Sequence, residues 1–240
     1  MNANPSYSIF PLGDAALVID FGNSINEQAN QYVLHLFHTI KKQQPPFIID
    51  LVPAYSSLAI YYDVKAVYRQ KEDDKTAFEV MAEWVESFTV SEIASTEDKK
   101  RLIRVPVCYH EKFATDILYI ARVNKITVEE IIELHTGATY TIFMIGFLPG
   151  FAYMGLVDER IAIPRKPQPE PVHAGAVGIA GRQTGIYPIA SPGGWQVVGR
   201  TPISLFNKNR EQPVLFQPGD SIKFYPITED EFTHYKSGSA

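Results

Sequence analysis

The chain has 240 residues, of which 45% are hydrophobic and 20% are charged, and its formal net charge at pH 7 is −5. This balance is typical of a soluble globular protein, and without a basic patch it argues against nucleic acid or an acidic membrane surface as a partner. No stretch comes near the roughly 18 consecutive apolar residues of a membrane-spanning helix, so the sequence predicts none.

The first residues and the cysteine content favour a cytoplasmic protein. The opening MNANPSYSIF has no basic stretch followed by an apolar one, which a secretory signal would need. Cys108 is the one cysteine of the chain, so no disulfide can form within it, as expected in a reducing compartment.

Short strands and amphipathic helices alternate over the first part of the chain. Residues 7–22 predict two strands joined by a turn, and residues 26–43 repeat apolar side chains along one helical face until Pro45 stops the helix. The runs FIIDLV and SLAIYY predict two more strands, and residues 74–89 a second helix. The order ββαββα indicates a small α+β domain over residues 1–95.

The composition changes after a polar stretch. Residues 91–100, SEIASTEDKK, predict a linker to a second domain over residues 96–240. Between residues 137 and 219 lie 12 of the 15 glycines and 10 of the 17 prolines. Such punctuation is typical of short strands joined by shaped turns.

The second domain begins with a strand, RLIRVPVCY, and two short helices. Thr115 is the expected N-cap of the first helix, and Thr127 with Glu130 predicts a capping box for the second, which ends near Gly137. Many short strands follow, which favours a closed or nearly closed β-barrel. The predicted strands are TYTIFMIGF, AVGIAG, QTGIYPI, WQVVGR and DSIKFYPI.

Familiar catalytic signatures are missing from the sequence. It has no G-x-x-x-x-G-K-[ST] phosphate loop, no G-x-S-x-G elbow and no Cys/His pattern with zinc spacing. The helix pair at residues 115–135 has the length of a helix-turn-helix. Its second helix carries Glu129, Glu130 and Glu133 and no Lys or Arg, which argues against a DNA-reading role. We therefore assign neither a metal ligand nor a catalytic residue.

The segment ASPGGWQVVGRTP, residues 190–202, has the features of a ligand site. Gly193 and Gly194 let a ligand approach the main chain, and their N–H groups suit an anion. Trp195 offers a flat apolar wall, and Arg200 a planar cation suited to a carboxylate. In a regular strand these two side chains point to opposite faces. They share a site only if a bulge at Gly199 intervenes; otherwise one of them is structural.

Four stretches together, GFLPGFAYMGL, IPRKPQPEP, HAGAVGIAGRQTGIYP and SPGGWQVVGRTP, resemble the family of the 5-oxoprolinase B subunit. That family includes the Kip-type inhibitor of a sporulation kinase and the first subunit of allophanate hydrolase. The resemblance implies a cyclophilin-like β-barrel behind a separate N-terminal α+β domain. It does not imply peptidyl-prolyl isomerase activity, because a fold does not carry a function with it.

The resemblance and the chemistry of these loops indicate a set of candidate substrate-binding residues. We expect them to wall an open cleft of the barrel, with guanidinium charge within reach. Core packing, a tight turn or a salt bridge is the structural alternative for each of them. The set comprises Phe147, Pro149, Gly150, Phe151, Tyr153, Arg165, Tyr187, Gly193, Gly194, Trp195 and Arg200.

The sequence departs from the family pattern at His110 and Glu111, where the family has two glycines, and at three positions nearer the candidate residues. Glu170 stands where the family has an arginine, His173 where it has a proline, and Ala176 where it has a serine. One positive charge is replaced by a negative one and one hydroxyl is lost. If these positions contact the substrate anion, this chain is expected to bind it less well or differently. A protonated His173 is able to restore a positive charge.

The resemblance implies one component of an ATP-dependent 5-oxoprolinase, a lactam hydrolase that opens 5-oxoproline to glutamate. The chain is expected to be inactive alone and to act with relatives of the C and A subunits on a small anionic substrate. Handling of ATP is expected from the complex, since this chain has no recognisable nucleotide loop. Two alternatives remain open: a binding module that inhibits a sensor histidine kinase, and half of a carboxyltransferase-like site for urea-derived or biotin-linked substrates.

Overall fold

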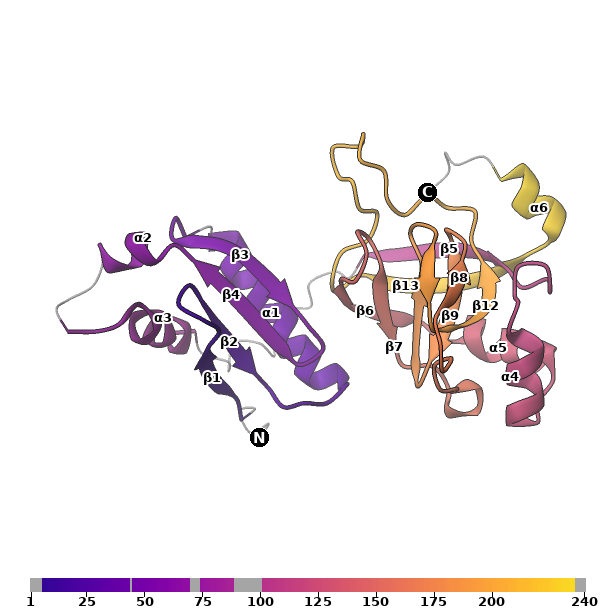
Figure 1. Cartoon of the computed structure of the whole chain (residues 1–240), viewed down its shortest axis with the longest axis horizontal. Coiled ribbons are helices and arrows are strands. Elements are labelled where there is room, and N and C mark those ends of the chain that lie inside the picture. Colours follow the sequence, from indigo (N-terminus) through magenta and orange to yellow (C-terminus); the bar gives the residue numbers. More distant parts are fainter. Residues whose placement is uncertain (1–5, 44, 70–73, 89–100, 236–240) are drawn as a thin grey trace. The chain divides into compact units, whose positions relative to one another are not determined.

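The computed structural model describes residues 6–43, 45–69, 74–88 and 101–235. The chain divides into two compact units, residues 1–98 and 99–240, which we call the first and the second unit (Figure 1). The predicted linker at 91–100 lies outside the described residues, and the predicted domain boundary at residue 95 stays a prediction.

The first unit is a four-stranded antiparallel sheet, in the order β1-β2-β4-β3, with helices packed against it. Alternation along the strands explains its core, because Leu17 and Ile19 of β2 and Leu58 and Ile60 of β4 are fully buried. The strands are β1 (Ser8–Pro11), β2 (Ala16–Asp20), β3 (Ile48–Pro53) and β4 (Ser57–Tyr62), and the helices are α1 (Glu27–Gln43), α2 (Val64–Tyr68) and α3 (Ala77–Glu86).

Helix α1 buries the apolar face that the sequence predicts, including Val33 and Ile40, against the sheet. Helix α2 was not expected, because its five residues are too few to show a periodic pattern. It begins at the carboxylate of Asp63, which accepts the N–H groups of Lys65 and Ala66 at 2.9 and 3.2 Å.

The second unit contains a closed barrel of seven strands, in the order β10-β7-β6-β13-β5-β12-β9 (Figure 1). This confirms the expectation of a closed barrel. The pairing is mixed, because β13 runs parallel to β5 whereas the other pairs are antiparallel. The barrel strands are β5 (Leu102–Cys108), β6 (Tyr140–Ile145), β7 (Ala152–Gly155), β9 (Ala176–Ala180), β10 (Gln183–Ile186), β12 (Gln196–Arg200) and β13 (Ser221–Ile227).

Shorter elements surround the barrel. Strands β8 (Glu170–Val172) and β11 (Ser191–Gly193) pair as a separate ribbon. The remaining elements are α4 (Ile117–Asn124), α5 (Val128–Gly137), the 3-10 turn η2 (Glu159–Ile161) and α6 (Glu229–His234). The predicted capping box of α5 is confirmed: Thr127 Oγ1 accepts the N–H of Glu130, and the Glu130 carboxylate accepts that of Thr127. In the part of the chain that the structure describes, no helix is long and apolar enough to cross a membrane.

The interior of the barrel is filled by side chains, among them Val105, Ile142, Ile179 and Phe224. The barrel is therefore a packed core rather than a channel, and any ligand has to bind outside it.

A polar chain crosses this core at His135. Thr184 Oγ1 donates to the carbonyl of Gly178 at 3.1 Å, so it accepts from His135 Nε2, which lies 2.9 Å away. His135 Nδ1 is left to accept the hydroxyl proton of Tyr109 at 2.7 Å. Burial lowers the pKa of His135 to about 3, so the imidazole is neutral and matches this chain of donors and acceptors.

Candidate functional site

An aromatic cluster lies on the outer face of the barrel. We define it as Phe147, Phe151, Tyr153, Tyr187 and Trp195. The Phe151 ring stands edge-on to those of Tyr187 and Trp195, with centroids 5.0 and 5.4 Å apart. Tyr153 lies 4.7 Å from Phe151 and 5.8 Å from Trp195, and Phe147 lies 5.8 Å from Phe151. Phe151, Tyr187 and Trp195 are buried, whereas Phe147 is 65% exposed, so the cluster runs from the core to the surface.

Glycines make room for these rings. A Cβ atom at Gly185 would lie 2.9 Å from the Trp195 ring and 3.0 Å from Phe151. A Cβ at Gly193 would lie 2.5 Å from Tyr187 Oη. Gly193 therefore stands beside Trp195 because the Tyr187 ring packs directly on its backbone, so this glycine has a packing role whether or not it also meets a ligand.

Cationic and hydroxyl groups face the cluster. The Arg165 guanidinium lies 5.8 Å from the Trp195 ring centroid, and Tyr187 Oη accepts the backbone N–H of Trp195 at 3.4 Å. Burial raises the pKa of Tyr153, with Arg165 acting against it, and burial likewise raises that of Tyr187 against the effects of the Trp195 N–H and Arg165. Both phenols stay protonated at neutral pH and remain hydrogen-bond donors.

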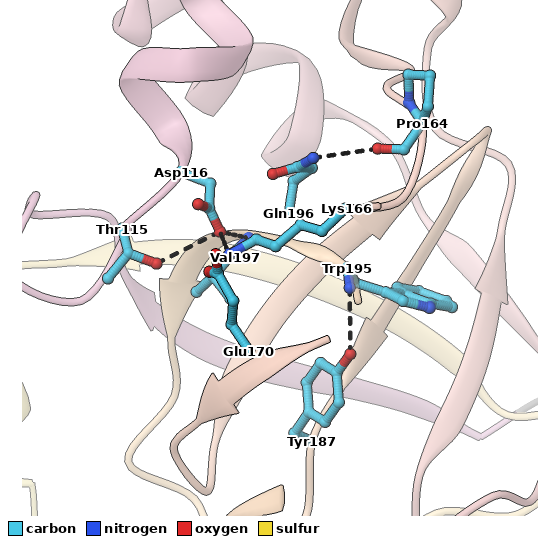
Figure 2. A network of polar contacts seen from close by, with 9 residues as sticks. All are labelled: Thr115, Asp116, Pro164, Lys166, Glu170, Tyr187, Trp195, Gln196 and Val197. Atoms are coloured by element: carbon cyan, nitrogen blue, oxygen red, sulfur yellow. Dashed lines mark hydrogen bonds and ion pairs between the residues drawn. The ribbon is translucent and has the colours of Figure 1, made fainter. Parts of the chain in front are cut away.

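A buried lysine, Lys166, holds in place the segment that contains its neighbour Arg165 (Figure 2). Lys166 Nζ lies 2.8 Å from Asp116 Oδ2 and 2.6 Å from Glu170 Oε2, and its side chain is only 10% exposed. The Lys166 backbone N–H donates to the carbonyl of Gly194 at 2.7 Å. Burial lowers the pKa of Lys166, but the hydrogen bonds to Asp116 and Glu170 outweigh it and hold the pKa above its usual value. The lysine is thus a charged anchor.

Asp116 also forms hydrogen bonds with β12 of the kind that a neighbouring strand would form. Strand β12 pairs with β5 only at Arg200 and Cys108. Farther along β12, the N–H of Val197 donates to Asp116 Oδ2 at 2.7 Å, and the carbonyl of Val197 accepts the N–H of Asp116 at 3.0 Å (Figure 2). Asp116, and not the expected Thr115, stands at the N-cap of α4, and it makes no side-chain cap. Its carboxylate instead accepts a hydrogen bond from the barrel strand β12. Local sequence patterns did not indicate this role.

A bulge brings Trp195 and Arg200 onto one face. The register of β12 on β9 shifts between Val197 and Gly199. Arg200 then pairs with Ala176, which packs in the same hydrophobic group as Trp195. Arg200 is nevertheless held by other contacts. Its Nε donates to the carbonyl of Ala174 at 2.8 Å, and its guanidinium lies 5.7 Å from the Phe232 ring of α6.

The structure thus gathers most of the candidate residues and separates a few. Phe147, Phe151, Tyr153, Arg165, Tyr187, Gly193, Gly194 and Trp195 lie in or beside the aromatic cluster. Pro149 is exposed in the loop before β7. Gly150 packs toward Leu205, Phe206 and Val214. Arg200 contacts Ala174 and Phe232.

The three departures from the family pattern have different surroundings. Glu170 pairs with Lys166, His173 is exposed, and Ala176 is buried against the cluster. The negative charge at position 170 therefore lies against Lys166, which Glu170 shares with Asp116.

The first unit has a hollow of its own, of about 420 Å³, between α1 and β3. Its lining is mostly apolar, with Lys41 and Asp50 as the charged members. No group of three or more metal-ligating side chains occurs among the residues that the structure describes.

Comparison with known proteins places these features in a family. Residues 7–216 match the model of the carboxyltransferase domain, subdomains C and D. The 5-oxoprolinase B subunit of Bacillus subtilis is 42% identical over 236 residues, which cover 97% of this chain and 98% of that protein. Its counterpart in Haemophilus influenzae is 33% identical over 218 residues, 90% of this chain and 96% of that one. The crystal structure of TTHA0988 is 30% identical with a TM-score of 0.75; it covers 88% of this chain, which spans 40% of that protein.

Proposed function

We propose, from the premise that the chain belongs to the carboxyltransferase domain family, subdomains C and D, and to the 5-oxoprolinase members of that family, that it is the B subunit of an ATP-dependent 5-oxoprolinase. The observation that carries the proposal is the 42% identity to the Bacillus subtilis protein over nearly the full length of both chains. We also propose that the barrel domain, residues 96–240, is cyclophilin-like and that it follows a separate α+β domain, residues 1–95.

The aromatic cluster supplies the groups that 5-oxoproline requires. The substrate is a flat five-membered lactam with a carboxylate. The half-buried ring of Tyr153, backed by the buried Trp195, offers a wall for the flat face, and Arg165 offers a cation for the carboxylate. We assign Arg165, Trp195, Tyr153 and Tyr187 to substrate binding. The phenols stay protonated, so they are able to donate to a carbonyl oxygen on which negative charge develops.

The hydrolytic step is proposed to need partners. Opening a lactam is coupled here to ATP, and the chain has neither a phosphate loop nor a group that we assign as catalytic. Relatives of the C and A subunits then complete the enzyme, and ATP is handled by the assembly. The exposed ring of Phe147 and the loop around Pro149 suit a contact surface for such a partner.

The test combines the purified chain with its relatives of the C and A subunits, ATP and 5-oxoproline, and follows glutamate. We expect glutamate from the full mixture and none when any protein or ATP is omitted. A full mixture that forms no glutamate, while the Bacillus subtilis set does so in parallel, rules out the proposed activity.

One alternative keeps a specific observation in its favour, because the matched family model is that of a carboxyltransferase domain. A carboxyltransferase-like role predicts that the same mixture carboxylates a urea-derived or biotin-linked acceptor. A kinase-inhibitor role instead predicts that the chain alone blocks autophosphorylation of a sensor histidine kinase. Running these two assays beside the glutamate assay separates the three functions.

A further inference from the structure

Gln183 has a buried amide nitrogen that no residue in the described chain satisfies. The residue is only 7% exposed, and its Nε2 atom has no hydrogen-bond partner among the residues that the structure describes. A buried donor without a partner costs stability, so such atoms are rare in native proteins and call for a reason. A bound ligand with an acceptor atom is one such reason.

The strand pattern places Gln183 on the face that carries the aromatic cluster. Thr184, the next residue of β10, points into the barrel, where it meets His135. Gly185 follows, and a Cβ there would touch the rings of Trp195 and Phe151. Because alternate residues of a strand share a face, the side chain of Gln183 emerges on the same outer face as these rings.

The register of the sheet puts Gln183 in one row with Trp195. Gln183 pairs with Ala180 of β9. Gln196 pairs with Ile179, so the antiparallel register brings Trp195 opposite Ala180. Neighbouring strands lie about 4.8 Å apart. Gln183 and Trp195 therefore flank Ala180 on the same face of the sheet, one on each neighbouring strand. Arg165 lies over the Trp195 ring.

A second buried atom points to the same region. Ser191 Oγ is likewise buried without a partner among the described residues. Ser191 pairs with Val172 in the β8–β11 ribbon, and Val172 packs in the hydrophobic group of Trp195 and Tyr187. In the described part of the second unit, Gln183 Nε2 and Ser191 Oγ are the only buried side-chain atoms of this kind.

We propose that Gln183 binds the lactam of the substrate, its Nε2–H group donating to the ring carbonyl oxygen while Arg165 takes the carboxylate. This rests on the proposed function and names the residue that recognises the lactam. The unpartnered group is a donor, so the ligand has to present an acceptor. A carboxylate at one end and an amide carbonyl at the other, on a small flat ring, match the cation, the aromatic wall and the amide. Gln183 is then a specificity residue.

The test uses the substitution Gln183→Leu in the full chain. For the wild type we expect 5-oxoproline to change the fluorescence of Trp195 in a Trp84→Phe background. Gln183→Leu should weaken this binding about tenfold, the effect of losing one hydrogen bond. Proline lacks the ring carbonyl, so its weaker binding should be the same in both proteins. The Tm of Gln183→Leu should equal or exceed that of the wild type, because the buried unpartnered donor is gone.

Gln196→Leu is the matched control. The Gln196 amide donates to the carbonyl of Pro164 at 3.2 Å, so losing it should lower the Tm. A purely structural role for Gln183 predicts the same fall in Tm for Gln183→Leu, and that result would overturn the inference.

Failure of this inference is distinguishable from failure of the proposed function. If the assembled mixture forms glutamate and Gln183→Leu leaves KM and kcat unchanged, the role of Gln183 is wrong and the function stands. If 5-oxoproline binds in a Gln183-dependent way but no mixture forms glutamate, the site stands and the function is wrong. If the wild type neither binds 5-oxoproline nor forms glutamate in the mixture, both are wrong.

Discussion

The glycines of the two units stand in different surroundings. Gly13 and Gly22 of the first unit have positive φ angles and open space where a Cβ would be. In the second unit, a Cβ at Gly185, Gly193 or Gly199 would lie within 3 Å of a neighbouring atom. Both units use glycine to turn the backbone, as at Gly181 of the second unit, which also has a positive φ and open space. Only the second unit also uses glycine to bring aromatic rings and strands against the main chain. Glycines within strands therefore indicate where rings or neighbouring strands pack against the backbone, including around the aromatic cluster.

The largest effect that distinguishes the units should come from pH. The folded second unit holds His135 neutral with a pKa of about 3, against an ordinary value of 6.5. The unfolded chain takes up a proton below pH 6.5 and the folded one does not. Stability should therefore fall by about 1.4 kcal/mol per pH unit as the pH drops from 6.5 toward 3.

Denaturant unfolding followed by Trp195, in a Trp84→Phe background, measures this slope in the second unit. A His135→Phe chain that still folds should show a smaller slope, because it has no imidazole to protonate. The lowered pKa values of Asp158, Glu229 and Glu231 leave some acid sensitivity at the lowest pH. An identical slope with and without His135 would mean that other groups cause the acid sensitivity.

The next largest loss of stability should come from removing a carboxylate, and it should differ between the two units. Asp116→Ala leaves the mostly buried Lys166 with Glu170 alone and leaves the N–H of Val197 without its acceptor. We expect a loss of about 3 kcal/mol in the unfolding free energy of the second unit. The control is Asp50→Ala in the first unit. Asp50 is exposed and, among the described residues, its side chain accepts only the N–H of Leu51, so its loss should stay within about 0.5 kcal/mol. Equal losses in urea unfolding would contradict the assigned role of Asp116.

Alanine at two glycines tests the comparison directly. Gly185→Ala drives a methyl group against Trp195, Phe151 and the carbonyl of Ala152, and should cost about 2 kcal/mol. A Cβ at Gly13 would contact no atom, so Gly13→Ala should cost only the strain of its φ of +67°, about 1 kcal/mol. Near-UV circular dichroism should change for Gly185→Ala alone, because only this variant displaces aromatic rings.

Apart from the Asp50→Ala control, the smallest effect on stability should come from Arg165→Ala. The guanidinium is exposed and lies over Trp195, a contact of about 0.5–1 kcal/mol. Binding of 5-oxoproline should nevertheless weaken more than tenfold in the same fluorescence titration, since the carboxylate loses its cation. Arg200→Ala is the comparison: its guanidinium contacts Ala174 and Phe232, so we expect it to change unfolding more than binding.

Local patterns predicted much of the framework. The apolar face of α1, the capping box at Thr127 and the closed barrel follow from periodicity, caps and turns in short windows of sequence. Features that depend on contacts between distant residues did not follow. Asp116 bonds Val197 across 81 positions, and no local signal distinguishes that role from helix capping.

The candidate site divides in the same way. Its aromatic and glycine residues were predicted from the family resemblance and from the chemistry of their loops. The position of Arg200 against Phe232 depends on α6, which has no motif to tie it to β12. The significance of Gln183 appears only when burial and hydrogen bonding are known, since its sequence context reads as an ordinary strand.

The parallel pairing of β13 with β5 has a consequence for synthesis on the ribosome. These are the last and the first strands of the barrel, and all seven residues of β5 have partners in β13. A nascent chain that has not yet emerged as far as Ile227 thus has no partner for that edge of β5. The ring of strands closes only once β13 has been made, and until then the growing polypeptide presents an open sheet edge, the kind of surface that chaperones shield.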